Sequence, residues 1–181
     1  ESDPGYIKGY PPGVREDGAQ YSHAATWAGW AFAMLGDGDR ALEIFNCVAP
    51  IEHAGSAPAL AKYQAEPYVV AADIYGVTPY LGRGGWTWYT GAAGWAYRLA
   101  VEMILGIRQS GAELLIKPCL PRSWSGYQAD LQLGGSRYAI EIQRDRTEPP
   151  GTFLDGKLQS DGIITLDTTG NSHSILVRIA D

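Results

Sequence analysis

The spacing of apolar residues along the chain changes near residue 110. Before this point, apolar residues recur at helical intervals in segments that Gly- and Pro-rich loops separate. The pattern predicts helices over residues 22–35, 40–49, 67–75 and 90–107. After residue 110, short segments rich in Val, Ile and Tyr alternate apolar and polar residues, which is typical of strands. These segments are AELLIKP, YQADLQL, RYAIEIQ, GIITLD and HSILVRIA.

The fold class follows from this division. The Asp155-Gly156 pair in FLDGKL favours the type I′ turn of a hairpin, and so many short strands pack most simply as two antiparallel sheets. We therefore expect an α+β chain with two domains, helices over residues 1–109 and an antiparallel β-sandwich over residues 110–181. Helices with long connections do not enclose a core alone, and the chain opens without Met, so we expect the helices to form one side of a larger helical barrel.

Composition narrows the classes of function. The chain has 181 residues and a formal net charge of −6, which argues against nucleic acid or an anionic membrane as a partner. An anion must therefore be held by a local site. Six Trp and eleven Tyr against three Phe suit a surface that is both apolar and hydrogen-bonding, as a sugar site is, and they equally suit an ordinary core.

The stretch GGWTWYTGAAGWAYR, residues 84–98, places Thr90 directly before the longest predicted helix. A hydroxyl there caps free backbone N–H groups, and Gly91 leaves those groups open to a ligand. A helix N-terminus of this kind binds anions because it carries partial positive charge. A Thr cap without a ligand explains the same residues. The aromatic residues nearby either wall a pocket or fill a corner: Trp86, Trp88, Tyr89 and Trp95.

The first predicted helix carries His23 in its first turn, on the same face as Trp27, Trp30 and Met34. This histidine is either a structural residue whose ring nitrogens are hydrogen-bonded within the protein, or an anion ligand that donates a hydrogen bond through a ring nitrogen.

The loop before this helix contains Arg15, Glu16 and Asp17. Adjacent residues of an extended loop point to opposite sides, so Glu16 and Asp17 do not form the carboxylate pair of a glycosidase. Either one of them accepts hydrogen bonds from sugar hydroxyls or the loop is a solvated turn.

Several motifs, in order, resemble the C-terminal part of glycoside hydrolase family 94. They are GYPPGVREDGAQYSHAATWAGWAFAMLGDGDRA, AEPYVVAADIY, GRGGWTWYTGAAGWAYR, and ILGIR followed by LLIKPCLPRSW. The family contains the cellobiose and chitobiose phosphorylases and the C-terminal region of cyclic β-1,2-glucan synthases. GGWTWYTG looks closest to the branch of the synthases and the β-1,2-oligoglucan phosphorylases. The resemblance implies the last helices of an (α/α)6 barrel followed by a jelly-roll-like β-sandwich.

The resemblance also implies inverting phosphorolysis of β-glucosides, in which inorganic phosphate attacks the anomeric carbon and an α-glucosyl 1-phosphate is released. Carried over position by position, it implies that His23, Thr90 and Gly91 bind phosphate and that Arg15 and Glu16 bind the sugar. Cellobiose-type members usually have Lys at the position of Arg15. Arginine differs from lysine in being a wider, forked donor. The general-acid Asp is expected upstream of this chain, so no catalytic residue and no cofactor are expected within it.

We therefore expect a fragment of a glycosyltransferase-type phosphorylase that is inactive alone. Its expected partners are a β-linked glucose oligosaccharide, phosphate and the rest of the same polypeptide, with a homodimer allowed. The implied location is cytoplasmic, at the cytoplasmic face of the inner membrane if the chain belongs to a glucan synthase. Two alternatives stay open: a non-catalytic glucan-binding or length-controlling module of a cyclic β-1,2-glucan synthase, and a helical-barrel hydrolase.

Overall fold

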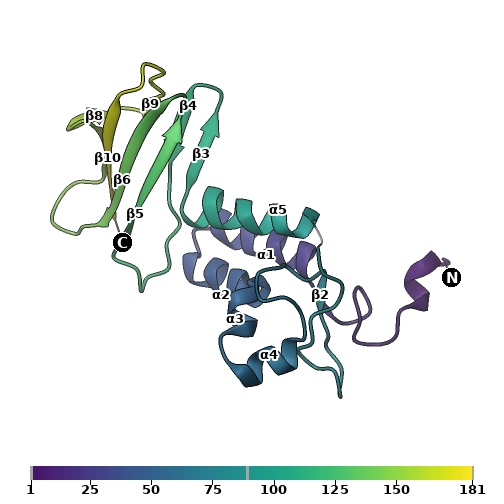
Figure 1. The fold of residues 1–181 in the computed structure, drawn as a ribbon. Helices are drawn as coiled ribbons and strands as arrows, with labels where there is room; N and C mark the ends of the chain where they lie inside the picture. The colour runs from purple at the N-terminus through teal and green to yellow at the C-terminus, as the bar shows by residue number, and fades with distance from the viewer. Residues whose placement is uncertain (1, 89, 181) are drawn as a thin grey trace. The chain divides into compact units, whose positions relative to one another are not determined.

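The computed structural model describes residues 2–88 and 90–180, except for the side chain of Thr90. The chain divides into two compact units, whose elements are drawn in Figure 1. The first unit consists of Glu1–Leu35 and Arg40–Ala100, and the second of Gly36–Asp39 and Val101–Asp181. The first is mainly helical and the second is built from strands, which confirms the predicted α+β class. Within the described residues, no helix is long and apolar enough to cross a membrane.

The first unit contains short helices joined by irregular segments. Its elements are the 3-10 helix η1 (Gly5–Gly9), β1 (Gln20–Tyr21), α1 (Ser22–Met34), α2 (Gly38–Val48, which begins in the second unit), α3 (Pro50–Ala54), α4 (Ala57–Tyr63), β2 (Asp73–Ile74) and α5 (Thr90–Arg98). α1 and α2 confirm the first two predicted helices. α3 and α4 were not predicted. Each has one Pro near its start, Pro50 at the first position of α3 and Pro58 at the second position of α4, where the missing N–H costs little.

Helices α1 and α5 pack side by side and run in the same direction (Figure 1). Their close approach depends on Gly29 of α1, because a Cβ at this position would lie 2.7 Å from Cδ2 of Leu99. Leu99 is fully buried and begins a π-helical turn, η2 (Leu99–Ile104). Because the helices are parallel, their N-terminal turns meet at the same end of the pair.

The helix predicted over residues 67–75 is wrong. The segment ends instead in β2, which pairs antiparallel with β1. On the other side, the Ala72 amide donates to the Trp86 carbonyl at 2.6 Å, and the Gly85 amide donates to the Asp73 carbonyl at 2.8 Å. Ala72 and Asp73 are both buried. Residues 71–73 are buried and the chain there is hydrogen-bonded on both sides, so this part is extended rather than an amphipathic helix.

The single helix predicted over residues 90–107 is also wrong in extent. α5 ends at Arg98, the π-helical turn η2 follows, and from Ile107 the chain is extended as β3 (Ile107–Ser110). Gly106 makes this change of direction. Its φ is +73°, and a Cβ there would lie 2.2 Å from backbone atoms of the chain that follows β4, so only glycine fits.

Within residues 101–180, the strands form two sheets. One has the order β5-β6-β10-β7-β8 and the other β3-β4-β9. The strands are β4 (Glu113–Ile116), β5 (Gly126–Leu133), β6 (Ser136–Arg144), β7 (Gly151–Leu154), β8 (Lys157–Gln159), β9 (Ile163–Thr165) and β10 (Ser172–Ile179). All strand segments predicted from the alternating pattern are present, and β3 is the strand that the pattern missed.

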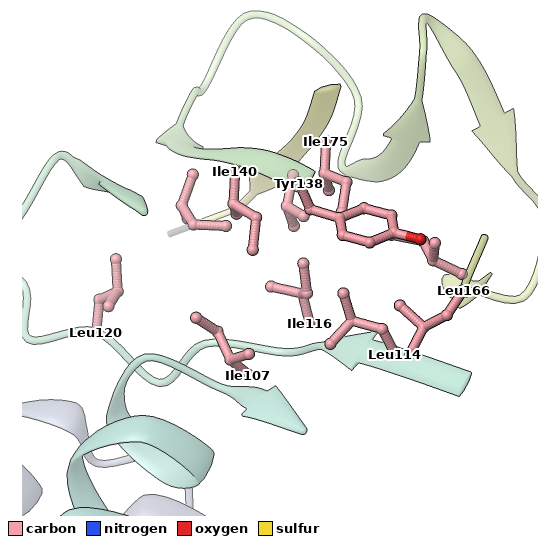
Figure 2. Packing of buried hydrophobic residues seen from close by; sticks show 11 residues of the cluster. Ile107, Leu114, Ile116, Leu120, Tyr138, Ile140, Leu166 and Ile175 are labelled. Carbon is pink, nitrogen blue, oxygen red and sulfur yellow. The ribbon is translucent and has the colours of Figure 1, made fainter. Parts of the chain in front are cut away.

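The two sheets share one buried apolar cluster (Figure 2). On β6 every second residue from Ser136 to Ile142 is buried, which is the period of a sheet with one covered face. In Figure 2, Tyr138 and Ile140 face Ile116 of the other sheet. Burial of this apolar surface is the main favourable contribution to the folding of the unit.

The sequence predicts only antiparallel pairing, and this prediction is wrong for one pair of strands. β10 pairs parallel with β6, from Ser172 opposite Arg137 to Ile179 opposite Arg144. Between these strands the chain passes through β7, β8 and then β9 of the other sheet, and this long crossover returns it in the direction of β6. The β7–β8 hairpin is confirmed, with positive φ at both Asp155 (+48°) and Gly156 (+77°), as a type I′ turn requires.

His173 of β10 holds two carboxylates with its ring. Its Nδ1 lies 2.8 Å from Oδ2 of Asp155, and its Nε2 lies 3.0 Å from Oδ2 of Asp167. The ring stacks on Tyr138 at a centroid distance of 5.2 Å, and the side chain is 17% exposed. The hydrogen bonds to Asp155 and then to Asp167 raise the pKa of His173 above its usual value of 6.5, because they favour the charged ring.

This arrangement predicts a pH-dependent contribution to stability. Because the pKa of His173 is raised in the folded state, its contribution is complete below about pH 6.5 and is lost as the pH rises through the folded pKa. The thermal midpoints of the wild type and His173→Gln, measured from acidic to alkaline pH, should therefore differ most at acidic pH and converge at alkaline pH. A difference that stays constant with pH would mean that His173 contributes only its packing on Tyr138.

Candidate functional site

His23 lies in the first turn of α1 with its ring among aromatic side chains. Its ring centroid is 4.9 Å from that of Trp27, 6.1 Å from that of Trp95 and 6.5 Å from that of Tyr21. Its Nε2 atom is buried, and within the described residues it has no hydrogen-bond partner. Buried polar atoms in folded proteins are nearly always hydrogen-bonded, so an exception calls for a functional explanation.

The N-terminal turn of α5 presents open backbone. Gly91 is exposed there, and a Cβ built on it would meet no atom within 4 Å. The first N–H groups of a helix have no partner inside the helix and carry partial positive charge. The side chain of Thr90, the other predicted phosphate ligand on this helix, and the whole of Tyr89 lie outside the described residues.

The structure brings two of the predicted phosphate ligands to the same end of the α1–α5 pair. Trp95 follows Gly91 by about one helical turn, and its ring is the neighbour of the His23 ring at an interplanar angle of 34°. His23 therefore lies beside the beginning of α5. An imidazole nitrogen next to free helix amides is a suitable arrangement for an oxyanion.

Trp95 packs against other aromatic side chains and also lines a hollow, so it has both of the roles that the sequence left open. Its ring meets Trp27 and Trp30 edge to face at centroid distances of 5.6 and 5.5 Å. The guanidinium of Arg98 lies 4.9 Å from the Trp95 ring and 5.1 Å from the Trp30 ring. The three tryptophans line a hollow of about 260 Å³, and Trp27 remains 54% exposed.

Arg15 is the centre of a second group of aromatic side chains. The residue is only 7% exposed, and its guanidinium carbon lies 4.6 Å from the Trp86 ring, 5.4 Å from the Tyr10 ring and 5.5 Å from the Tyr21 ring. These distances are in the range of cation–π attraction. The guanidinium is therefore held by rings on several sides, which is the environment of a planar donor used for recognition.

Glu16 accompanies this arginine, as the resemblance implies for the sugar-binding pair. Its Oε2 lies 3.8 Å from Nε of Arg15, and its side chain is 30% exposed. Arg15 also lines a cavity of about 330 Å³. The remaining lining residues are Tyr10, Pro11, Val14, Asp73, Tyr75, Tyr80 and Trp86. Aromatic walls with a cation and an acceptor suit a sugar ring.

Asp73 is the residue of this group that sequence reasoning missed. It is 1% exposed, and burial raises the pKa of its carboxyl, although the hydrogen bond from the Arg15 amide and the charge of Arg15 oppose the rise. Its Oδ2 accepts that amide hydrogen bond at 2.7 Å. The signal in the sequence was a single acid inside the apolar run VVAADIY, which is unusual unless the acid has a partner.

Tyr21 connects the two groups. It lies under the Arg15 guanidinium on one side and neighbours the ring of His23 on the other. The residues proposed for sugar and for phosphate, except for the undescribed Thr90 side chain, thus belong to one region of the first unit.

Comparison with known proteins places the chain in a family. A family model described as the Glycosyl hydrolase 94 superfamily, catalytic domain, matches residues 1–106. The chain belongs to this family. The match covers the whole of the region that carries His23, Gly91, Arg15 and Glu16.

Relatives within the family are phosphorylases and a glucan synthase. The chain is 54% identical over 145 residues to the cyclic beta-(1,2)-glucan synthase NdvB of Rhizobium meliloti. This alignment covers 80% of this chain and 5% of the relative. It is 36% identical over 142 residues to the N,N'-diacetylchitobiose phosphorylase of Vibrio furnissii, covering 78% of this chain and 17% of the relative. The chain thus spans less than a fifth of the length of either protein.

A third relative extends over nearly the whole chain. The solabiose phosphorylase of Paenibacillus borealis is 26% identical over 177 residues, covering 96% of this chain and 23% of the relative. Among solved structures, a family GH92 alpha-mannosidase from Bacteroides thetaiotaomicron aligns over 93% of this chain and 18% of its own at 11% identity. Its TM-score of 0.32 is too low to say anything about the fold of this chain.

Proposed function

We propose that this chain is the C-terminal segment of an inverting β-glycoside phosphorylase and supplies residues that bind phosphate and sugar. The observation that carries the proposal is the buried Nε2 of His23, which has no partner among the described residues and lies beside the open N-terminal turn of α5. Membership of the glycosyl hydrolase 94 superfamily, with phosphorylases among the relatives, supports it.

Phosphorolysis explains why a single anion site is enough on this side of the reaction. An inverting hydrolase needs one carboxylic acid to protonate the leaving oxygen and one carboxylate to activate water. Phosphate is already an anionic nucleophile. An oxygen of phosphate forms a bond to the anomeric carbon, the bond to the glycosidic oxygen breaks, and the general acid gives that oxygen a proton. The products are an α-glycosyl 1-phosphate and the shortened sugar.

The general acid belongs, in this proposal, to an upstream part of the polypeptide. Residues 1–109 then form the C-terminal portion of an (α/α)6 barrel, and residues 110–181 form a β-sandwich that follows it. His23, Gly91 and Thr90 bind the phosphate, while Arg15 and Glu16 hold the sugar. Neither a metal ion nor an organic cofactor takes part, and the enzyme acts in the cytoplasm.

Product analysis tests the proposal. The full-length protein that contains this chain is incubated with β-1,2-linked gluco-oligosaccharides, cellobiose or chitobiose, with and without inorganic phosphate. We expect an α-linked sugar 1-phosphate, detected by ³¹P NMR, only when phosphate is present, and no product from residues 1–181 alone. Free sugar released in phosphate-free buffer would instead identify a hydrolase.

A second candidate function is favoured by one observation, the 54% identity to a cyclic beta-(1,2)-glucan synthase. In this alternative, the chain belongs to a module that binds glucan or controls its length within a synthase, and binding matters more than turnover. Glucan binding that persists without phosphate, together with the absence of any sugar 1-phosphate from the intact protein, would select it over the phosphorylase.

A further inference from the structure

The backbone of Arg15 adopts a conformation that side-chain-bearing residues rarely take. Its φ is +50°, in the left-handed region, where non-glycine residues are uncommon and arginine is not among the residues that are enriched. Such conformations persist only where the surrounding structure determines them, and they gather at binding sites. Some contact must therefore hold residue 15 in this state.

Besides the Ala19 amide, which donates to the Arg15 carbonyl at 3.1 Å, Asp73 makes such a contact. Its Oδ2 accepts a hydrogen bond from the Arg15 amide at 2.7 Å, across 58 residues of sequence. A buried hydrogen bond is strengthened by the low dielectric around it. The bond acts on the backbone of Arg15 and does not involve its guanidinium.

Asp73 is itself fixed from two sides. In the β1–β2 pair it lies opposite Tyr21, and its carbonyl accepts the Gly85 amide at 2.8 Å. The same glycine makes room for the carboxylate, because a Cβ at position 85 would lie only 1.9 Å from Oδ1 of Asp73. The carboxylate is therefore closely confined, and the Arg15 amide donates its hydrogen bond to a rigid acceptor.

The consequence appears at the other end of the arginine. With the backbone of residue 15 held, the guanidinium lies against the rings of Trp86, Tyr10 and Tyr21 at the edge of the 330 Å³ cavity. A typical negative φ at this residue would redirect the Cα–Cβ bond and take the guanidinium away from these rings. The position of the guanidinium thus depends on Asp73, which lines the same cavity.

We propose that Asp73 is a positioning residue that fixes Arg15 for sugar binding. The inference rests on the role of Arg15 in the proposed function. It extends that function by adding a residue 58 positions away that acts through its hydrogen bond to the Arg15 backbone. Preorganisation of this kind contributes to affinity because the binding group loses less conformational freedom when the ligand arrives.

A double-mutant cycle in the full-length protein tests it. Asp73→Ala is expected to raise the KM for the β-glucoside about tenfold, while the KM for phosphate changes less than about twofold. In the Arg15→Ala background, the same substitution should raise the sugar KM no further, because the two residues act as one unit. Asp73→Asn retains an oxygen acceptor of the same size, so it should recover part of the affinity. Glu52→Gln, at an exposed acid of α3 in the same unit, is the control and should change neither KM.

Three results would overturn the inference. Equal effects of Asp73→Ala with and without Arg15, or an equal rise in both KM values, would mean that Asp73 supports the unit in general rather than Arg15. If Asp73→Ala does not fold, the same comparison is made with Asp73→Asn, which should still affect only the sugar KM and only when Arg15 is present. An Arg15→Ala variant with an unchanged sugar KM would remove the proposed role of Arg15 itself, and the inference with it.

Discussion

Replacing His23 with Ala is expected to raise the KM for phosphate about 10- to 100-fold in the full-length protein. The Nε2 of His23 is buried without a partner in the described chain, so it is free to donate to phosphate beside the amides of α5. A hydrogen bond to a charged group contributes about 1.5–3 kcal/mol, and about 1.4 kcal/mol corresponds to a tenfold change in affinity. Initial rates of phosphorolysis over a range of phosphate concentrations measure the effect.

Two further variants make this result specific. His23→Gln places an amide nitrogen close to the position of Nε2, so it should recover part of the phosphate affinity. His53→Gln is the matched control, because His53 lies in the same unit but already donates through Nε2 to the Cys47 carbonyl at 2.8 Å and stacks on Tyr63. If His23→Ala and His53→Gln show the same phosphate KM and both keep the thermal midpoint of the wild type, His23 is not a phosphate ligand.

Replacing Gly91 with Ala is expected to weaken phosphate binding about tenfold or more without destabilising the protein. The new methyl group has room, since no atom lies within 4 Å of the Cβ position, and Ala favours a helix over Gly by up to about 1 kcal/mol. The methyl group lies at the N-terminal turn, however, where it keeps an oxyanion away from the free N–H groups. The thermal midpoint and the phosphate KM should therefore both rise, so that the protein becomes more stable while its affinity for phosphate falls.

Gly94 provides the control for this substitution. It lies three residues further along the same exposed helix surface, and a Cβ at Gly94 also meets no atom within 4 Å. Gly94→Ala should therefore give the same or a larger gain in stability but leave the phosphate KM unchanged, because the N–H groups there are bonded within the helix. A loss of phosphate affinity of equal size in both variants would show that helix rigidity, rather than access to the amides, controls binding.

The parts of the fold that could be predicted from the sequence are those with local signals. α1 has its apolar spacing within the helix itself, and the β7–β8 hairpin has Asp155-Gly156 at its turn. The segment 67–75 misled because Pro67 at its start favours a helix, whereas the groups that keep it extended come from β1 and from residues 85 and 86. The parallel pairing of β6 with β10 has no local signal either, because it depends on the route of the chain between them.

Some residues of the candidate site could be predicted from the sequence and others could not. His23, Gly91, Arg15 and Glu16 could be named in advance because they occur in motifs that resemble a family. Asp73 lies within the motif AEPYVVAADIY, but the resemblance gives it no role, and its partner is a backbone amide far away in the sequence. That the His23 Nε2 has no partner among the described residues likewise could not be predicted, because it depends on how Tyr21, Trp27 and Trp95 surround the ring.

The place of β10 has a consequence for how the second unit is made during synthesis. This strand lies between β6 and β7 in the middle of the sheet, yet its residues 172–179 are translated after every other strand of that unit. A nascent chain that stops short of them holds two separate hairpins, β5–β6 and β7–β8, each with an unprotected edge. The sheet can therefore close only after residue 179 has left the ribosome, and until then those edges are open to pairing with neighbouring chains.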